Sequence, residues 1–311
     1  MAKLGESRVN LKVFLELVEI KAKIASVWPF LLGLIFVFHN YGRLNAGVSL
    51  LFFIAMFLFN MAVDINDNYQ DYTKADDNQA AEWKKHTNII GVHHLNVHGI
   101  FALMASFTVV AALIGLYLVW LTGWPLLVMG IFCFLVGYLY AGGPKPLSGT
   151  PTGEFFAGFT MGFMIMAITV YLNLYQTGDL TLSLWGRVLL ASGVAVMAIA
   201  ALLLANNICD AQEDLDLNRT TIVYFIGKRR ALWLFAGFYV VGYLSLVASV
   251  LLGDLPIWSL LALISAIPVG KNIHAFFQVQ VKKETFILAV RNLGLLAVFT
   301  VVCEGLGLLS L

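Results

Sequence analysis

The sequence predicts an all-α membrane protein with about nine transmembrane helices, on the basis of its composition and the length of its apolar runs. Of its 311 residues, 60% are hydrophobic and only 12% are charged, and the mean hydropathy is +0.86. A soluble protein carries roughly twice that charged fraction. The apolar residues are gathered in runs of roughly 20, the length that an α-helix needs to cross a bilayer.

Nine apolar runs are candidate spans, and no soluble domain fits between them, so we expect a single membrane domain over residues 1–311. The fifth run holds Gly158 and Gly162 at a spacing that lets helices pack closely. The eighth is short and contains Pro268, so we expect it to tilt, break or lie partly among its neighbours. In chain order, the predicted spans cover residues 24–38, 48–63, 99–121, 125–140, 154–175, 188–208, 232–252, 257–269 and 286–309.

Composition also excludes several classes of protein. The three cysteines all lie in apolar runs and cannot form the framework of a secreted disulfide-rich protein. The 19 basic residues nearly balance the 18 acidic ones, which excludes a disordered chain and a basic face for nucleic acid. We therefore expect no nucleic-acid partner, and no obligate protein partner is evident. The polar N-terminus does not resemble a cleavable signal peptide.

The basic residues predict the orientation of the chain. With the N-terminus in the cytoplasm, only Arg43 and Arg187 of the 19 basic residues fall in outer loops. This bias is typical of the cytoplasmic side of a membrane protein. Of the 18 acidic residues, only Asp179, Asp254 and Glu304 fall on or near the outer side. Charges gathered at one face of an apolar protein indicate a polar site there, facing the cytoplasm.

A first acidic cluster lies at the inner end of the second span. Asp64, Asp67 and Asp71 follow Asn60 at offsets of 4, 7 and 11 residues. These offsets place all four side chains on one stripe of a helix.

A second cluster lies at the inner end of the sixth span, where Asp210 and Asp214 follow Asn206 at offsets of 4 and 8 residues. The two clusters share the pattern Asn-x-x-x-Asp, repeated after 146 residues. Stacked carboxylates repel one another, so we expect a cation to offset their charge. Mg²⁺ fits best, since it takes one or two carboxylates together with phosphate oxygens. Two facing clusters could clamp one diphosphate; the plainer alternative is a pair of solvated helix ends.

The paired motifs resemble those of the UbiA superfamily of intramembrane prenyltransferases, and the branch that they resemble most is the 1,4-dihydroxy-2-naphthoate polyprenyltransferase (MenA) type. The resemblance extends over most of the chain and implies a UbiA-like helical bundle. Further matches are Lys21-Ala-Lys23, Tyr140-Ala-Gly-Gly-Pro144-Lys145-Pro146, Thr150-Pro-Thr-Gly153-Glu154, Arg219-Thr220-Thr221 and Ile226-Gly227-Lys228.

The resemblance implies Mg²⁺-dependent transfer of a polyprenyl group from its diphosphate to an aromatic acceptor, within the cytoplasmic membrane. Under this hypothesis five aspartates are catalytic metal ligands: Asp64, Asp67, Asp71, Asp210 and Asp214. The implied substrate-binding residues are Asn60, Asn206, Lys23, Lys145 and Tyr140. Aromatic faces that could steady an allylic cation are those of Tyr138, Tyr140, Phe155 and Phe156.

Several alternatives stay open at the level of sequence. The acceptor could be 4-hydroxybenzoate or homogentisate in place of 1,4-dihydroxy-2-naphthoate. A cation-coupled secondary transporter would also carry intramembrane acids and a repeat, although transporter sites lie near the bilayer midplane. Lys282 and Lys283 are most simply interpreted as contacts to anionic lipid headgroups, and the weaker alternative is that one of them draws in the anionic acceptor.

Overall fold

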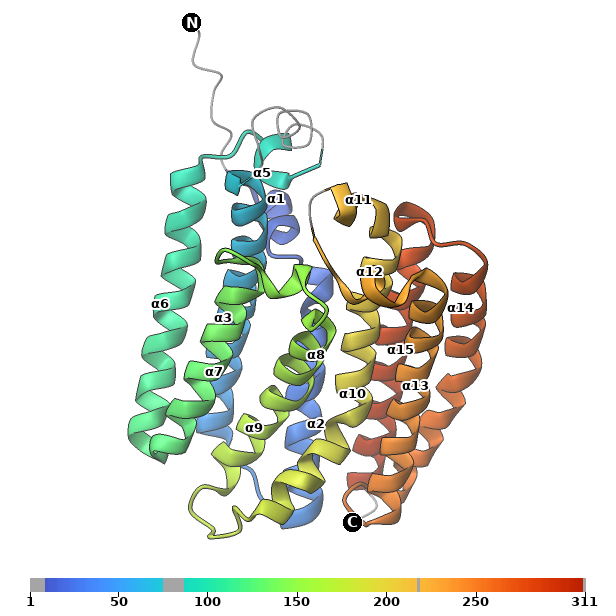
Figure 1. Cartoon of the computed structure of the whole chain (residues 1–311). Helices are drawn as coiled ribbons and strands as arrows, with labels where there is room; N and C mark the ends of the chain where they lie inside the picture. Colours follow the sequence, from blue (N-terminus) through green and yellow to red (C-terminus); the bar gives the residue numbers. More distant parts are fainter. Residues whose placement is uncertain (1–8, 75–86, 217–218, 310–311) are drawn as a thin grey trace, which may run out of the picture.

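The computed structural model describes residues 9–74, 87–216 and 219–309, and every regular element in these ranges is helical. The long helices run up and down as a bundle, with several short helices gathered at one end (Figure 1). Within the described ranges, nine segments are long and apolar enough to cross a membrane, and each overlaps one predicted span. The predicted fold class is therefore confirmed. The segments are Ile20–Tyr41, Ala46–Thr73, Val97–Thr122, Trp124–Ala141, Gly153–Leu174, Leu182–Cys209, Lys228–Leu251, Ile257–Gln278 and Lys282–Leu308.

The individual elements, in chain order, are α1 (Leu11–Leu17), η1 (Ile20–Lys23), α2 (Ile24–Tyr41), α3 (Ala46–Lys74), α5 (Ile89–Val92), α6 (Val97–Thr122), α7 (Trp124–Ala141), η2 (Leu147–Gly149), α8 (Gly153–Ala157), η3 (Gly158–Met164), α9 (Ile165–Leu174), α10 (Leu182–Cys209), α11 (Ala211–Asp216), α12 (Ile222–Ile226), α13 (Lys228–Leu251), η4 (Ile257–Ser265), α14 (Ala266–Gln278) and α15 (Lys282–Leu308).

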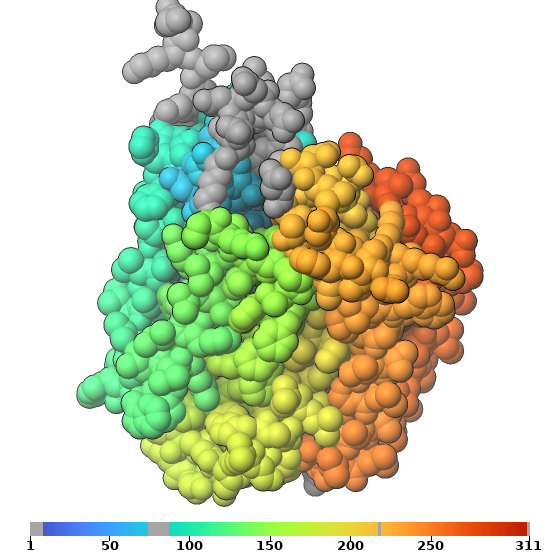
Figure 2. Space-filling model, viewed as in Figure 1, coloured from blue at the N-terminus to red at the C-terminus, as the bar shows by residue number. Residues whose placement is uncertain are grey.

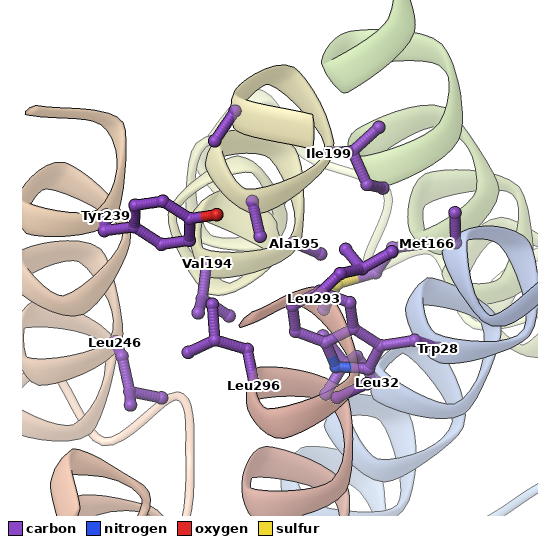
Figure 3. Close-up of a cluster of buried hydrophobic side chains, with 14 of the residues drawn as sticks. Trp28, Leu32, Met166, Val194, Ala195, Ile199, Tyr239, Leu246, Leu293 and Leu296 are labelled. Atoms are coloured by element: carbon purple, nitrogen blue, oxygen red, sulfur yellow. The ribbon is translucent and has the colours of Figure 1, made fainter. Parts of the chain in front are cut away.

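Helix α10 lies at the centre of the bundle, between α2, α8 and α9 on one side and α13 and α15 on the other (Figure 1). Small residues such as Ala195 and Ala198 let these neighbours approach it closely. Figure 3 shows the core that results, where Trp28 of α2 and Leu293 of α15 converge on α10. Two-thirds (67%) of the apolar window of α10 is buried, against 11% for α6. Helix α6 therefore lies at the periphery of the bundle.

The close approach predicted for the fifth span is confirmed. A methyl group added at Gly158 would lie 2.6 Å from the carbonyl oxygen of Val196, and one at Gly162 would lie 2.6 Å from the backbone nitrogen and Cα of Val196. The segment η3, which carries both glycines, is wound as a π-helix between α8 and α9. Such segments are rare and occur frequently at functional sites.

Two predicted spans end too early, because polar residues continue their helices beyond the apolar run. Helix α3 runs on to Lys74, well past the predicted end at Val63, and the eighth span runs to Gln278, past Val269. Polar side chains at a membrane surface interrupt an apolar run without interrupting backbone hydrogen bonds. The eighth span does change its winding, from the 3-10 helix η4 to α14, three residues before Pro268, whose nitrogen cannot donate.

The second cluster departs from the predicted single stripe, because α10 ends at Cys209 and a short helix, α11, begins at Ala211. The chain turns at Asp210, which caps α10. Hydrogen bonds still join the stripe, since the Asp210 N–H donates to the Asn206 carbonyl at 2.9 Å and the Asp214 N–H donates to the Asp210 carbonyl at 2.8 Å.

A polar group, which we name the far-end cluster, lies at the opposite end of the bundle and consists of Asn40, Arg187 and Asp254. Arg187 pairs with the buried carboxylate of Asp254 and donates to the Asn40 side-chain oxygen at 2.7 Å. Asn40 in turn donates to the Asp254 carbonyl at 2.9 Å. The cluster joins the end of α2, the start of α10 and the loop after α13.

Candidate functional site

The first cluster is built on one face of α3, as its spacing predicts. Asn60, Asp64 and Asp67 line a cavity of about 580 Å³. Lys23, which is 3% exposed, forms an ion pair with Asp64 and donates to the Asn60 carbonyl at 3.3 Å. Asp71 lies two turns beyond Asp64, is exposed, and is not part of the cavity lining. Lys23 therefore belongs to this cluster through Asp64.

The second cluster comes from α10, α11 and the start of α15. Asn206 lines the same cavity and donates to the Asp210 Oδ2 at 3.1 Å, and Lys282 forms an ion pair with that oxygen. Asp214 is buried, with its Oδ1 3.2 Å from Arg219 Nε. Burial raises the pKa of Asp214 to about 6, against the opposing charge of Arg219. Protonation below that pH would remove its charge.

The cavity joins the two clusters to an apolar compartment. Its charged and amide side chains come from Glu19, η1, α3 and α10, and most of the remaining wall is apolar surface of α3, α6, α7, η3 and α10. Tyr140 and Phe156 line it, whereas Tyr138 and Phe155 do not and are more than half exposed. Lys145 is also exposed and lies outside the lining. An anionic head and a long apolar tail could both be held in a cavity of this kind.

A cover lies over the ends of the helices that carry the two acidic clusters. In Figure 2 the green segment that follows α7 lies against the yellow-orange segment that follows α11. The Thr220 N–H donates to the Gly149 carbonyl at 3.0 Å, and Arg219 donates to the Ser148 carbonyl at 3.4 Å. These bonds hold the guanidinium of Arg219 over the site.

Arg219 also links the two clusters, since its charge acts on Asp67 and Tyr140 as well as on Asp214. The sequence placed Arg219 only within a matching motif and gave it no role. The signal that could have found it is its position directly after the second cluster.

Two further acidic residues were missed. Glu19 lines the cavity, interacts electrostatically with Asp64 and Asp67, and has a left-handed backbone (φ 47°), which is uncommon for a residue other than glycine. Buried Glu154 accepts a hydrogen bond from the buried Asn207 at 2.8 Å, which fixes α8 to α10 beside the second cluster. Neither stands at the spacing of the repeat, and Glu154 was recognised only as part of a matching motif.

The donor set fits a Mg²⁺ that shares its coordination with a phosphate better than a cage made by the protein alone. Among the described residues, no three His, Cys, Asp or Glu side chains are close enough to hold a metal. The repulsion expected within each cluster is partly offset by lysine and arginine partners. Asn60 Oδ1 and Asp214 Oδ2 are nevertheless buried without a hydrogen-bond partner in the described ranges. Buried oxygens of this kind are suitable ligands for a hard cation.

Comparison with known proteins agrees with the motifs. The model of the UbiA prenyltransferase family matches residues 26–296. The 1,4-dihydroxy-2-naphthoate octaprenyltransferase of Bacillus subtilis (strain 168) is 28% identical over 258 residues, which cover 82% of this chain and 78% of the relative.

Solved structures show the same fold. A UbiA homolog from Archaeoglobus fulgidus, bound to GPP and Mg²⁺, has a TM-score of 0.61 at 12% identity and covers 96% of this chain and 100% of its own. A UbiA homolog from Aeropyrum pernix K1 has a TM-score of 0.66 at 16% identity, with 92% and 98% covered. Since the family model matches most of its length, this chain belongs to the UbiA prenyltransferase family and is a prenyltransferase.

Proposed function

We propose that this protein transfers a polyprenyl group from polyprenyl diphosphate to 1,4-dihydroxy-2-naphthoate, giving demethylmenaquinone in menaquinone biosynthesis. The observation that carries the proposal is the pair of Asn-x-x-x-Asp motifs at the ends of α3 and α10. Asn60, Asp64 and Asn206 line one cavity with an apolar wall, and Asp210 accepts a hydrogen bond from Asn206 at its edge. The Bacillus subtilis relative, named for this acceptor, supports its choice over 4-hydroxybenzoate and homogentisate. The acids lie near the ends of α3 and α10, which favours this enzyme over a transporter with a midplane site.

The aspartates of both clusters would hold Mg²⁺: Asp64, Asp67, Asp71, Asp210 and Asp214. Asn60 and Asn206 would supply neighbouring amide oxygens, and Lys23 and Arg219 would add positive charge near the diphosphate. Bound Mg²⁺ would stabilise the negative charge that develops on the departing diphosphate.

The reaction itself is an exchange of one bond for another. The allylic C–O bond breaks with its electron pair going to diphosphate, and a ring carbon of the acceptor supplies the pair for the new C–C bond. The acceptor's carboxylate leaves as carbon dioxide, and the electron pair of its C–C bond stays in the ring and restores aromaticity. The direct product is therefore the quinol form of demethylmenaquinone. Tyr140 and Phe156 present aromatic faces to the cavity, where they would steady the positive charge of the allylic carbon. The apolar wall would exclude water, which would otherwise capture that carbon. Exposed Lys145 would meet the diphosphate only at the cavity mouth.

The proposal also sets the location of the enzyme. We place it in the cytoplasmic membrane, with both clusters toward the cytoplasm, because the basic residues are concentrated at that end of the chain's spans.

The direct test incubates purified protein with Mg²⁺, a polyprenyl diphosphate and each candidate aromatic acid, and identifies the product by mass. Asp64→Asn and Asp210→Asn should each reduce turnover by orders of magnitude. Asp210→Asn should change the melting temperature little, because its partner Lys282 is exposed, whereas Asp64→Asn leaves the buried ammonium of Lys23 without its partner and should lower it. Retention of more than about a tenth of the wild-type rate by both variants would refute the metal clamp.

A second test concerns coupling between metal and diphosphate. Each ligand completes the other's coordination, so their binding should be mutually reinforcing. We expect Mg²⁺ alone and a non-hydrolysable prenyl diphosphate analogue alone to raise the melting temperature only slightly. Together they should raise it by more than the sum, and Asp64→Asn or Asp210→Asn should abolish the excess. Simple additivity in the wild type would mean that the clusters do not share one diphosphate.

A further inference from the structure

The start of α15 reaches the rim of the site, a position that the sequence assigned to lipid contacts. Lys282 is the first residue of α15, and its ammonium is paired with Asp210. One turn later, Phe286 lines the cavity, and the Lys282 ammonium lies 5.8 Å from its ring centroid. The adjacent Lys283 is also exposed, but among the described residues it forms no ion pair with an acid. Two neighbouring lysines thus have different surroundings.

Each Asn-x-x-x-Asp motif therefore has its aspartate paired with a lysine from the start of another span. Lys23, directly before α2, pairs with Asp64, and Lys282 pairs with Asp210. The two lysines differ in burial, since the side chain of Lys23 is 4% exposed and that of Lys282 is 47% exposed. Lys282 can consequently change its rotamer into solvent or toward the cavity, whereas the buried Lys23 side chain is confined by its neighbours.

The Asp210 Oδ2 accepts from both Lys282 and Asn206. A carboxylate oxygen offers about two lone-pair sites, so these two donors occupy it. A divalent cation that binds through this oxygen has to displace one of them. Of the two donors, the Lys282 ammonium carries the positive charge that a cation would replace. Its side chain is also the more exposed and can move away.

We propose that Lys282 is a positioning residue that occupies the cation position at Asp210 and moves to the diphosphate when metal and diphosphate bind. The inference rests on the proposed function, because it requires a diphosphate at the second cluster. An ammonium is a compact point charge that suits phosphate oxygens. The exchange preserves charge balance, since Asp210 passes from a lysine to a metal while the diphosphate gains the lysine. Lys282 therefore opposes metal binding alone and favours metal binding with diphosphate.

The test measures Mn²⁺ binding by the paramagnetic resonance signal of free Mn²⁺, in detergent, without turnover. Lys282→Gln should bind Mn²⁺ alone about three- to fivefold more tightly than wild type, as expected for removal of one partly exposed ion pair. In the presence of Mn²⁺, the same variant should bind inorganic pyrophosphate about three- to fivefold more weakly. Lys282→Arg, which keeps the charge, should restore most of the pyrophosphate affinity.

Lys283→Gln is the matched control, because it removes the same charge one residue away, and it should change both affinities less than about twofold. Equal Mn²⁺ affinity in Lys282→Gln and Lys283→Gln, or tighter Mn²⁺ binding without weaker pyrophosphate binding, overturns the inference. Asp210→Asn separates this failure from failure of the proposed function. If Asp210→Asn no longer binds Mn²⁺, the proposed metal site at Asp210 is supported even where the Lys282 inference fails. If Asp210→Asn binds Mn²⁺ as tightly as wild type, the proposed metal site at Asp210 is itself wrong.

Discussion

Substitution of Gly162 by alanine tests how closely the fifth span has to approach α10. The added methyl carbon would lie 2.6 Å from the backbone of Val196, while ordinary contact begins at 3.4 Å. Segment η3 and helix α10 must therefore separate by about 0.8 Å, the difference between 3.4 and 2.6 Å, because the Val196 backbone cannot rotate away as a side chain can. Overpacking of this kind costs about 1–3 kcal/mol, of which the better helix propensity of alanine returns less than about 1 kcal/mol.

The displacement also reaches the site. Segment η3 carries Thr160 and Met161, and α10 carries Asn206, all of which line the cavity. Misplacement by about 1 Å can lower a catalytic rate by up to about a hundredfold. We therefore expect Gly162→Ala to lose both melting temperature and turnover.

Gly237→Ala is the matched control, because nothing lies within 4 Å of the position where its methyl group would stand on α13. It should gain up to about 1 kcal/mol from helix propensity. In detergent, followed by tryptophan fluorescence, Gly162→Ala should melt about 5 °C below Gly237→Ala. Equal melting temperatures and equal turnover in the two variants would refute the packing argument.

The remaining predictions concern charge and topology. Lys23→Met leaves the carboxylate of Asp64 without its partner and should cost about 3 kcal/mol, and addition of Asp64→Asn should recover part of that loss in thermal melts. Arg187→Met should destabilise the protein by a similar amount, about 3 kcal/mol, because Asp254 is 0% exposed, yet it should leave Mn²⁺ affinity unchanged; altered Mn²⁺ affinity would contradict the separation of the two ends. Thr73→Cys should react with an impermeant thiol reagent only in opened cells, and labelling of intact cells would reverse the proposed topology.

The sequence predicts the spans and the first cluster well because both depend on local periodicity. Asn60, Asp64 and Asp67 share a face on any regular helix, and α3 is regular throughout. The break at Asp210 was not predicted, because offsets of 4 and 8 residues assume that a helix continues.

Pairings between distant parts of the chain could not be predicted in this way. Lys23 and Asp64 are 41 residues apart, and Asp210 and Lys282 are 72 apart, so the packing of whole helices decides whether they meet. The exposed position of Lys145 outside the cavity could not be predicted either, because its neighbouring prolines restrict its backbone but do not show where the cavity lies. The π-helical winding of η3 has no periodic signature, because its apolar residues also fit an α-helix.

The far-end cluster fixes α2 and α10 to each other at the end of the bundle opposite the site, so a tilt of α10 about that end displaces its other end most. Asn40, Arg187 and Asp254 fasten α2 and α10 where the acidic clusters are most distant. Helix α10 has 28 residues and is therefore about 42 Å long. A tilt of about 5° around the fastened end moves its other end by about 4 Å, from the helix length alone. A swing of this size would change the separation of Asn206 from the α3 residues that line the same cavity, while the contacts at the fastened end are kept.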